Sequence, residues 1–104
     1  MAINPLKILF VASEVEGLVK TGGLADVAKA LPQHLAREGH DVRIILPFYQ
    51  TLKRRDEARL LASRWLPTPQ GRDDISYRIY QLELDGICVY LLDCPAYFER
   101  PQLY

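Results

Sequence analysis

Two short apolar runs flank one stretch with helical periodicity, and this order restricts the fold more than any other feature of the sequence. Residues 7–13 (KILFVAS) and 41–46 (DVRIIL) are rich in aliphatic and β-branched side chains. A run of this kind is typical of a strand that is buried on both faces, as in a parallel sheet covered by helices. A strand, a crossover helix and a second strand over this length predict a βαβ unit with a right-handed crossover.

The stretch between the two runs predicts an amphipathic helix. Its apolar residues recur at intervals of three and four and form one helical stripe: Leu24, Val27, Ala28, Leu31 and Leu35. Thr21 is the expected N-cap, and Gly39 stands where a left-handed residue would end the helix. Pro32 lacks a backbone N–H, so we expect a kink or a break at that position.

The second half of the chain has a different character, in which turns and short strands replace the helical spacing. Residues 49–59 are polar and basic, and they predict a short exposed helix. We expect its cationic side chains to be solvated: Lys53, Arg54, Arg55 and Arg59. Residues 60–66 have the composition of a strand, and residues 67–74 are rich in turn formers.

Two further runs, residues 75–84 and 86–92, flank the dipeptide Asp85-Gly86. This pattern is a strong signal for a tight β-hairpin. We therefore expect an antiparallel ribbon inserted after the βαβ unit, whereas residues 96–104 complete no element. The predicted fold class is α/β, a partial Rossmann-like arrangement with a βαβ unit and an inserted antiparallel hairpin.

The composition excludes several classes of protein. A chain of 104 residues, 49% hydrophobic and 25% charged, has the size of one small domain. Its 13 basic residues balance its 13 acidic residues. It therefore lacks the net positive charge that attracts nucleic acid or an anionic membrane. No apolar run approaches the roughly 18 residues of a membrane span, and no basic segment precedes a signal core.

The two cysteines indicate a reducing compartment. Cys88 and Cys94 lie on what reads as one extended segment. A separation of six residues places them about 20 Å apart, against a limit of about 7 Å between the Cα atoms of a disulfide. We expect free thiols and a cytoplasmic location.

The loop between the first strand and the helix carries the chemistry. It contains Lys20, Thr21, Gly22 and Gly23, and it lies at the carboxyl end of the strand, where open α/β sheets bind their ligands. Adjacent glycines let a backbone approach a ligand closely, and a helix N-terminus attracts anions. Lys20 adds a point charge suited to a phosphate. The spacing matches neither Gly-x-Gly-x-x-Gly nor the P-loop, so on spacing alone a tight turn remains an equal interpretation.

The whole string is more specific than its spacing. Residues 7–47 contain ILFVASEVEGLVKTGGLADVAKALP followed by GHDVRIILP, and CVYLLDCPAYFERP comes later. These segments resemble the amino-terminal end of bacterial glycogen synthases and plant starch synthases, in which a Lys-x-Gly-Gly-Leu motif opens the first helix. The chain departs from many relatives at Glu16-Gly17, where they carry an aromatic residue and a proline.

The resemblance implies a retaining glycosyltransferase that moves glucose from ADP-glucose to the non-reducing end of an α-1,4-glucan such as glycogen. Such enzymes have two Rossmann-like lobes that face each other across a cleft. Residues 1–104 would be the leading part of the N-terminal lobe, without the C-terminal lobe, so we expect this chain alone to be inactive.

The motif also implies a binding site for ADP-glucose. Lys20 corresponds to the donor-binding lysine, Gly22 and Gly23 to residues whose backbone approaches the diphosphate, and Asp26 to a group that orients a sugar hydroxyl or the loop. The family's catalytic residues have no counterpart positions here, and we expect no metal or cofactor.

Other reactive residues have plainer interpretations. Glu14 and Glu16 resemble the carboxylate pair of glycoside chemistry, but loop solvation and helix-dipole complementarity explain them more simply. The remaining candidates suit structural roles, namely packing for the cysteines and tyrosines and solvent or turn positions for the histidines: His34, His40, Cys88, Cys94, Tyr77, Tyr80 and Tyr90.

Two other functions compete with the glycosyltransferase. A nucleotide-binding oxidoreductase needs a Gly-x-Gly turn and an acidic residue after the second strand, where this chain has Pro47, Phe48 and Tyr49. A non-catalytic module that binds glucan or nucleotide is the alternative we retain.

Overall fold

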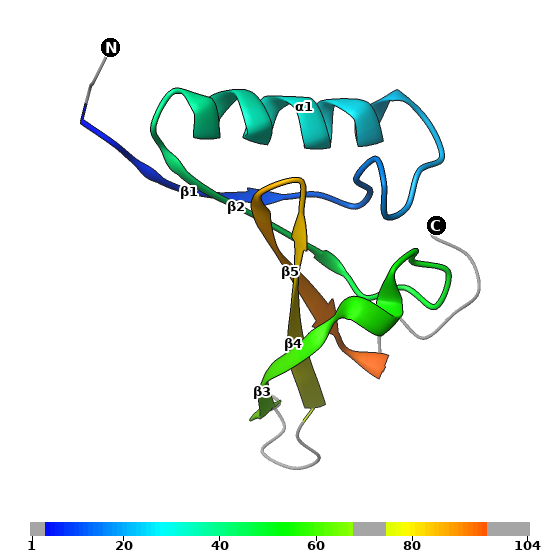
Figure 1. Cartoon of the computed structure of the whole chain (residues 1–104). Coiled ribbons are helices and arrows are strands. Elements are labelled where there is room, and N and C mark those ends of the chain that lie inside the picture. Colours follow the sequence, from blue (N-terminus) through cyan, green and yellow to red (C-terminus); the bar gives the residue numbers. More distant parts are fainter. Residues whose placement is uncertain (1–3, 68–74, 96–104) are drawn as a thin grey trace.

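A computed structural model describes residues 4–67 and 75–95, which form a single sheet with one covering α-helix (Figure 1). The elements of this part, in chain order, are β1 (Lys7–Val11), α1 (Gly23–Arg37), β2 (Asp41–Pro47), the 3-10 helix η1 (Arg55–Glu57), β3 (Arg59–Leu66), β4 (Ile75–Leu84) and β5 (Ile87–Asp93). The predicted turn at 68–74 and the predicted absence of an element at 96–104 lie outside the described residues. No helix of the described part is long and apolar enough to cross a membrane.

The βαβ unit predicted from the sequence is confirmed. β1 and β2 pair in parallel, with Phe10 opposite Ile44, and α1 connects them along one face of the sheet (Figure 1). The hairpin is confirmed too, since β4 and β5 pair antiparallel around Asp85 and Gly86, whose φ angles are 48° and 84°. Positive φ at both residues is what a tight turn between twisted strands requires.

The hairpin belongs to the same sheet as the βαβ unit. β5 pairs in parallel with β2, and Ile44 lies opposite Val89. The strand order is therefore β1-β2-β5-β4-β3, with β3 on the edge that is far from β1 (Figure 1). β5 thus becomes the central strand, which joins the parallel and antiparallel halves of the sheet.

The core lies between α1 and the face of the sheet that it covers. Ala28 of α1 packs in one cluster with buried residues of the central strands, Ile44, Leu46, Val89 and Leu91. The segment after β2 adds Phe48, Tyr49 and Leu52 to this cluster. The short exposed helix expected at 49–59 is therefore wrong: only η1 is helical, and Tyr49 and Leu52 before it are buried in the core.

The opposite face of the parallel strands is open. Leu9 and Val11 of β1 are 55% and 75% exposed, although the apolar run predicts burial on both faces. The reason is that β1 is an edge strand and that, within the described residues, α1 covers one face only. Apolar side chains on a parallel strand normally pack under a second layer.

The buried face of the helix agrees only in part with the predicted stripe. Ala28 of the stripe is buried, together with Ala25 and Pro32, whereas three other members of the stripe are exposed: Leu24, Val27 and Leu31. The two rows lie side by side on the helix, and both have helical spacing. Small side chains let α1 approach the sheet closely, which leaves the row of larger side chains facing outward.

The ends of α1 agree only in part with the prediction from the sequence. Gly22 is the N-cap and no side chain caps the helix, so the expected cap by Thr21 is wrong. The helix also continues through Pro32 without a break. Gly39 has a φ of 101° directly after the C-cap, as predicted for the residue that ends the helix.

An ion pair ties α1 to the β4–β5 turn. Lys29 Nζ lies 2.8 Å from Asp85 Oδ2, and this contact lowers the pKa of Asp85 below its usual value. A carboxylate with a lowered pKa stabilises the fold above its usual pKa of about 4, and the stabilisation is lost as the pH falls through the lowered pKa.

We expect Asp85→Asn to destabilise the chain more at pH 7 than at pH 2. Asparagine tolerates the left-handed backbone of position 85, so the substitution removes the charge and keeps the turn. Urea unfolding at both pH values measures the difference in unfolding free energy, which is small because Asp85 is half-exposed. An equal loss at both pH values would contradict the role of the ion pair.

Candidate functional site

The loop at residues 12–22 connects the carboxyl end of β1 to the N-terminus of α1. Its middle is closed by two backbone hydrogen bonds of 3.0 Å between Val15 and Val19, and Gly17 turns the chain with a φ of 95°. Val15 and Leu18 are fully buried, and the Leu18 carbonyl accepts a 2.8 Å hydrogen bond from the N–H of Lys53. The apolar part of the loop is therefore anchored in the core.

Glu14 anchors the rest of the loop. Its side chain is only 2% exposed. Oε1 accepts hydrogen bonds from the N–H groups of Thr21 (3.2 Å) and Gly22 (3.1 Å), and Oε2 accepts one of 2.5 Å from the Thr21 hydroxyl. The expectation that Glu14 is solvated is wrong, because its carboxylate satisfies backbone N–H groups of the turn that precedes α1.

Lys20 and Asp26 lie next to each other on the exposed side of the loop. Lys20 Nζ is 2.9 Å from Asp26 Oδ1, and both side chains are half-exposed. This hydrogen bond raises the pKa of Lys20, and the negative charges of Glu16 and Glu14 raise it further. The same hydrogen bond lowers the pKa of Asp26. The structure thus brings together two of the residues predicted from the motif and keeps a charged ammonium at the surface.

Gly22 and Gly23 occupy positions where the fold itself does not require glycine. Gly22 is extended, with φ −166° and ψ −161°, and Gly23 is the first residue of α1. A Cβ on either would meet no atom of the described residues within 4 Å. Gly22 and Gly23 therefore do not form a tight turn that depends on glycine.

The open space over the glycines adjoins donors that α1 leaves unused. The first N–H groups of an α-helix have no partner within the helix. Gly22 donates to Glu14 and Ala25 donates to the Gly22 carbonyl, so within the described part of the chain Gly23 and Leu24 present the remaining donors of the first turn. Together with the ammonium of Lys20 they form a donor-rich surface that suits a phosphate or another oxyanion.

The other candidate residues have structural surroundings. His40 Nδ1 accepts a 3.0 Å hydrogen bond from the Leu6 N–H, and His34 is exposed near Glu38. Tyr80 packs on Phe48 with ring centroids 4.7 Å apart. The two cysteines are free thiols, and the described residues contain no cluster that could hold a metal ion.

Two arginines of the basic run have partners that the sequence did not reveal. The Arg55 guanidinium lies 3.9 Å from the centroid of the Phe48 ring and donates to the carbonyl oxygens of Phe48 and Tyr49. Arg54 forms two hydrogen bonds of 2.8 Å with Glu57 and one of 2.9 Å with the Glu83 carbonyl. The expectation of a purely solvated charge run is wrong for both arginines: Arg54 ties the segment after β2 to β4, and Arg55 holds that segment together.

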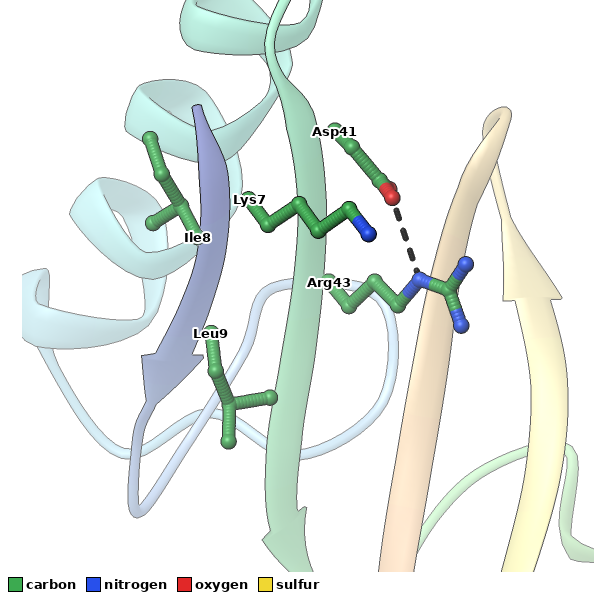
Figure 2. Close-up of a pocket in the computed structure, with 5 residues that line it drawn as sticks. All are labelled: Lys7, Ile8, Leu9, Asp41 and Arg43. Carbon is green, nitrogen blue, oxygen red and sulfur yellow. Dashed lines mark hydrogen bonds and ion pairs between the residues drawn. The ribbon is translucent and has the colours of Figure 1, made fainter. Parts of the chain in front are cut away.

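Two of the hollows on the surface lie along the parallel strands, and one of these adjoins the start of the loop. One is bounded by residues at the amino ends of β1 and β2, where Arg43 Nε is 3.4 Å from Asp41 Oδ1 (Figure 2). The other lies at the carboxyl ends of the strands on the uncovered face and has a volume of about 450 Å³. Its lining is apolar and includes Val11, Ile45 and Leu92. Because ligands bind at the carboxyl ends of parallel strands, the glycine loop rather than the hollow of Figure 2 is the candidate site.

The fold and the loop define a class of protein: an α/β protein whose candidate site lies where a parallel strand passes into a helix. Comparison with known proteins identifies the family within this class. Residues 7–104 match the starch synthase catalytic domain, and the chain belongs to this family.

Relatives and a solved structure agree with this assignment. The chain is 83% identical over 104 residues to the glycogen synthase of Aeromonas salmonicida, covering all of this chain and 21% of that protein. It is 54% identical over 101 residues to the glycogen synthase of Photobacterium profundum, covering 97% of this chain and 20% of that protein.

The catalytic domain of starch synthase IV from Arabidopsis thaliana, solved with ADP and acarbose bound, shares the fold of this chain with a TM-score of 0.84. The sequence identity is 29%, and the match covers 97% of this chain and 21% of that one. The α/β fold class predicted from the sequence is thereby confirmed. The chain spans about a fifth of the length of the relatives that it matches.

Proposed function

We propose that this chain is the leading part of the N-terminal lobe of a two-lobed glycogen synthase. The enzyme would transfer glucose from ADP-glucose to the non-reducing end of an α-1,4-glucan with retention of configuration. The observation that carries the proposal is the glycine loop that presents Lys20 at the carboxyl end of β1, in a chain 83% identical to a glycogen synthase. A starch synthase solved with ADP and acarbose supports a nucleotide donor and a glucan acceptor.

Within this enzyme the loop would bind the diphosphate of ADP-glucose. Cleavage of the bond between glucose and ADP increases the negative charge on the distal phosphate. Lys20 and the N–H groups at the start of α1 would stabilise that charge more in the transition state than in the ground state. Gly22 and Gly23 would keep the approach open, and Asp26 would hold Lys20 in place or orient a sugar hydroxyl. The catalytic residues would come from the remainder of the enzyme.

The open face of the sheet supports the view that this chain is part of a larger domain. Exposed Leu9 and Val11 border the apolar hollow at the carboxyl ends of the strands, and the relatives are about five times as long as the chain. We expect the remainder of the catalytic domain to cover this face, and the C-terminal lobe to complete the cleft. The free thiols Cys88 and Cys94 support a cytoplasmic enzyme.

A chimera tests the function. In it, residues 1–104 of this chain replace the matching segment of the Aeromonas salmonicida glycogen synthase. We expect the chimera to incorporate glucose from ADP-glucose into glycogen, and the 104-residue chain alone to incorporate none. A folded chimera that binds ADP-glucose without transferring glucose would favour the non-catalytic module instead. Turnover by the isolated chain would refute its proposed dependence on the missing part.

A further inference from the structure

We propose that Glu14 is a positioning residue that fixes the geometry of the donor site, a role that rests on the proposed function. Among the described residues, Glu14 is the charged side chain buried most deeply in the core. Its two carboxylate oxygens gather three donors from two consecutive residues, Thr21 and Gly22. The carboxylate thus clamps the backbone immediately before α1.

The clamp acts on Lys20 from one side. On the other side, the backbone of Val19 is held by its two hydrogen bonds with Val15. Lys20 lies between these two anchored residues, so its Cα has little freedom and its exposed side chain starts from a defined point. An exposed lysine on an unanchored loop would have to be ordered each time a ligand binds, at a cost in conformational entropy.

The same contacts argue against a role for Glu14 in proton transfer. Both of its oxygens already accept hydrogen bonds from the loop, and its burial keeps it from the surface on which Lys20 lies. The oxygens of the carboxylate are therefore used to hold the loop through hydrogen bonds, and a neutral side chain of the same shape would serve almost as well.

Glutamine and alanine at position 14 separate these roles. In Glu14→Gln the amide oxygen still accepts from the two N–H groups, and the amide nitrogen donates to the Thr21 hydroxyl. In Glu14→Ala the clamp is lost. Because a displacement of about 1 Å costs up to about 100-fold in rate, we expect kcat/KM for ADP-glucose to fall by that order in the alanine variant of the chimera and to be largely retained in the glutamine variant.

Glu38→Ala, which removes an exposed carboxylate just beyond α1, is the matched control and should leave the kinetics unchanged. A glutamine variant that is as impaired as the alanine variant would overturn the positioning role, as would an alanine variant with full activity. If Glu14→Ala does not fold, Thr21→Val removes one donor of the clamp at an exposed position. It should lower kcat/KM, and unchanged kinetics would also overturn the proposal.

Amide hydrogen exchange in the 104-residue chain tests the clamp without any substrate. We expect the Thr21 and Gly22 amides to be protected in the unsubstituted chain and in Glu14→Gln. Loss of the Thr21 hydroxyl donor in Thr21→Val should speed exchange at both amides. Equal protection in the valine variant would count against the clamp. An unsubstituted chimera without transferase activity would refute the proposed function alone, since the exchange experiment does not depend on it.

Discussion

Lys20→Ala in the chimera is expected to lower kcat/KM for ADP-glucose by about 100- to 1,000-fold, the usual effect of removing one preorganised donor from a developing negative charge. The ammonium is exposed at the loop, and its raised pKa keeps it charged at neutral pH. Loss of its exposed ion pair with Asp26 should hardly change stability, because such pairs contribute little. The loss of activity should therefore occur in a fully folded enzyme.

Steady-state kinetics across a donor titration measure this effect. Lys53→Ala is the matched control, since Lys53 is also exposed but lies outside the glycine loop, and it should retain the activity of the unsubstituted chimera. Lys20→Arg keeps the charge but changes its shape, so it should recover part of the loss. Unchanged kinetics in Lys20→Ala would contradict the proposal that this lysine binds the donor.

Gly22→Val is expected to reduce kcat/KM for ADP-glucose by about 100-fold, because its side chain would displace the diphosphate from the start of α1 by about 1 Å or more. The fold should tolerate the substitution at the small cost of a poorer N-cap. Gly22 has an extended backbone that valine adopts readily, and a Cβ there points into open space. The N–H that donates to Glu14 is also retained.

Kinetics and urea unfolding on the same samples separate the two effects. Gly86→Ala is the opposite control: Gly86 has a φ of 84°, so a side chain there is strained. It should cost about 1–2 kcal/mol in stability while the chemistry of the glycine loop is unchanged. Full activity in Gly22→Val would show that the glycine is a feature of the turn, and would contradict a ligand at this position.

The fold was predictable from the sequence to the extent that it depends on local patterns. The apolar runs located β1 and β2, and Asp85-Gly86 located the β4–β5 turn. Which face each element covers was not predictable in the same way. The rows Leu24-Val27-Leu31 and Ala25-Ala28-Pro32 both have helical spacing, and only packing against the sheet determines which of them is buried.

The candidate site was likewise predictable only where it depends on a local motif. Lys20, Gly22, Gly23 and Asp26 could be selected from one continuous motif, and the structure places them around the N-terminus of α1. Glu14 could not be assigned its role, because its partners are seven and eight residues away across a turn. Its only signal was an acidic residue directly after an apolar strand, which is equally typical of a solvated loop.

The most direct test of the proposed donor site is a crystal structure of the chimera with ADP-glucose bound in a catalytically impaired variant that keeps this loop intact. The distance that decides is the one between Lys20 Nζ and the nearest oxygen of the distal phosphate. We predict about 2.7–2.9 Å, as for a charge-assisted hydrogen bond, with the diphosphate facing the first turn of α1. A donor bound elsewhere, with Lys20 still paired to Asp26, would contradict the proposal.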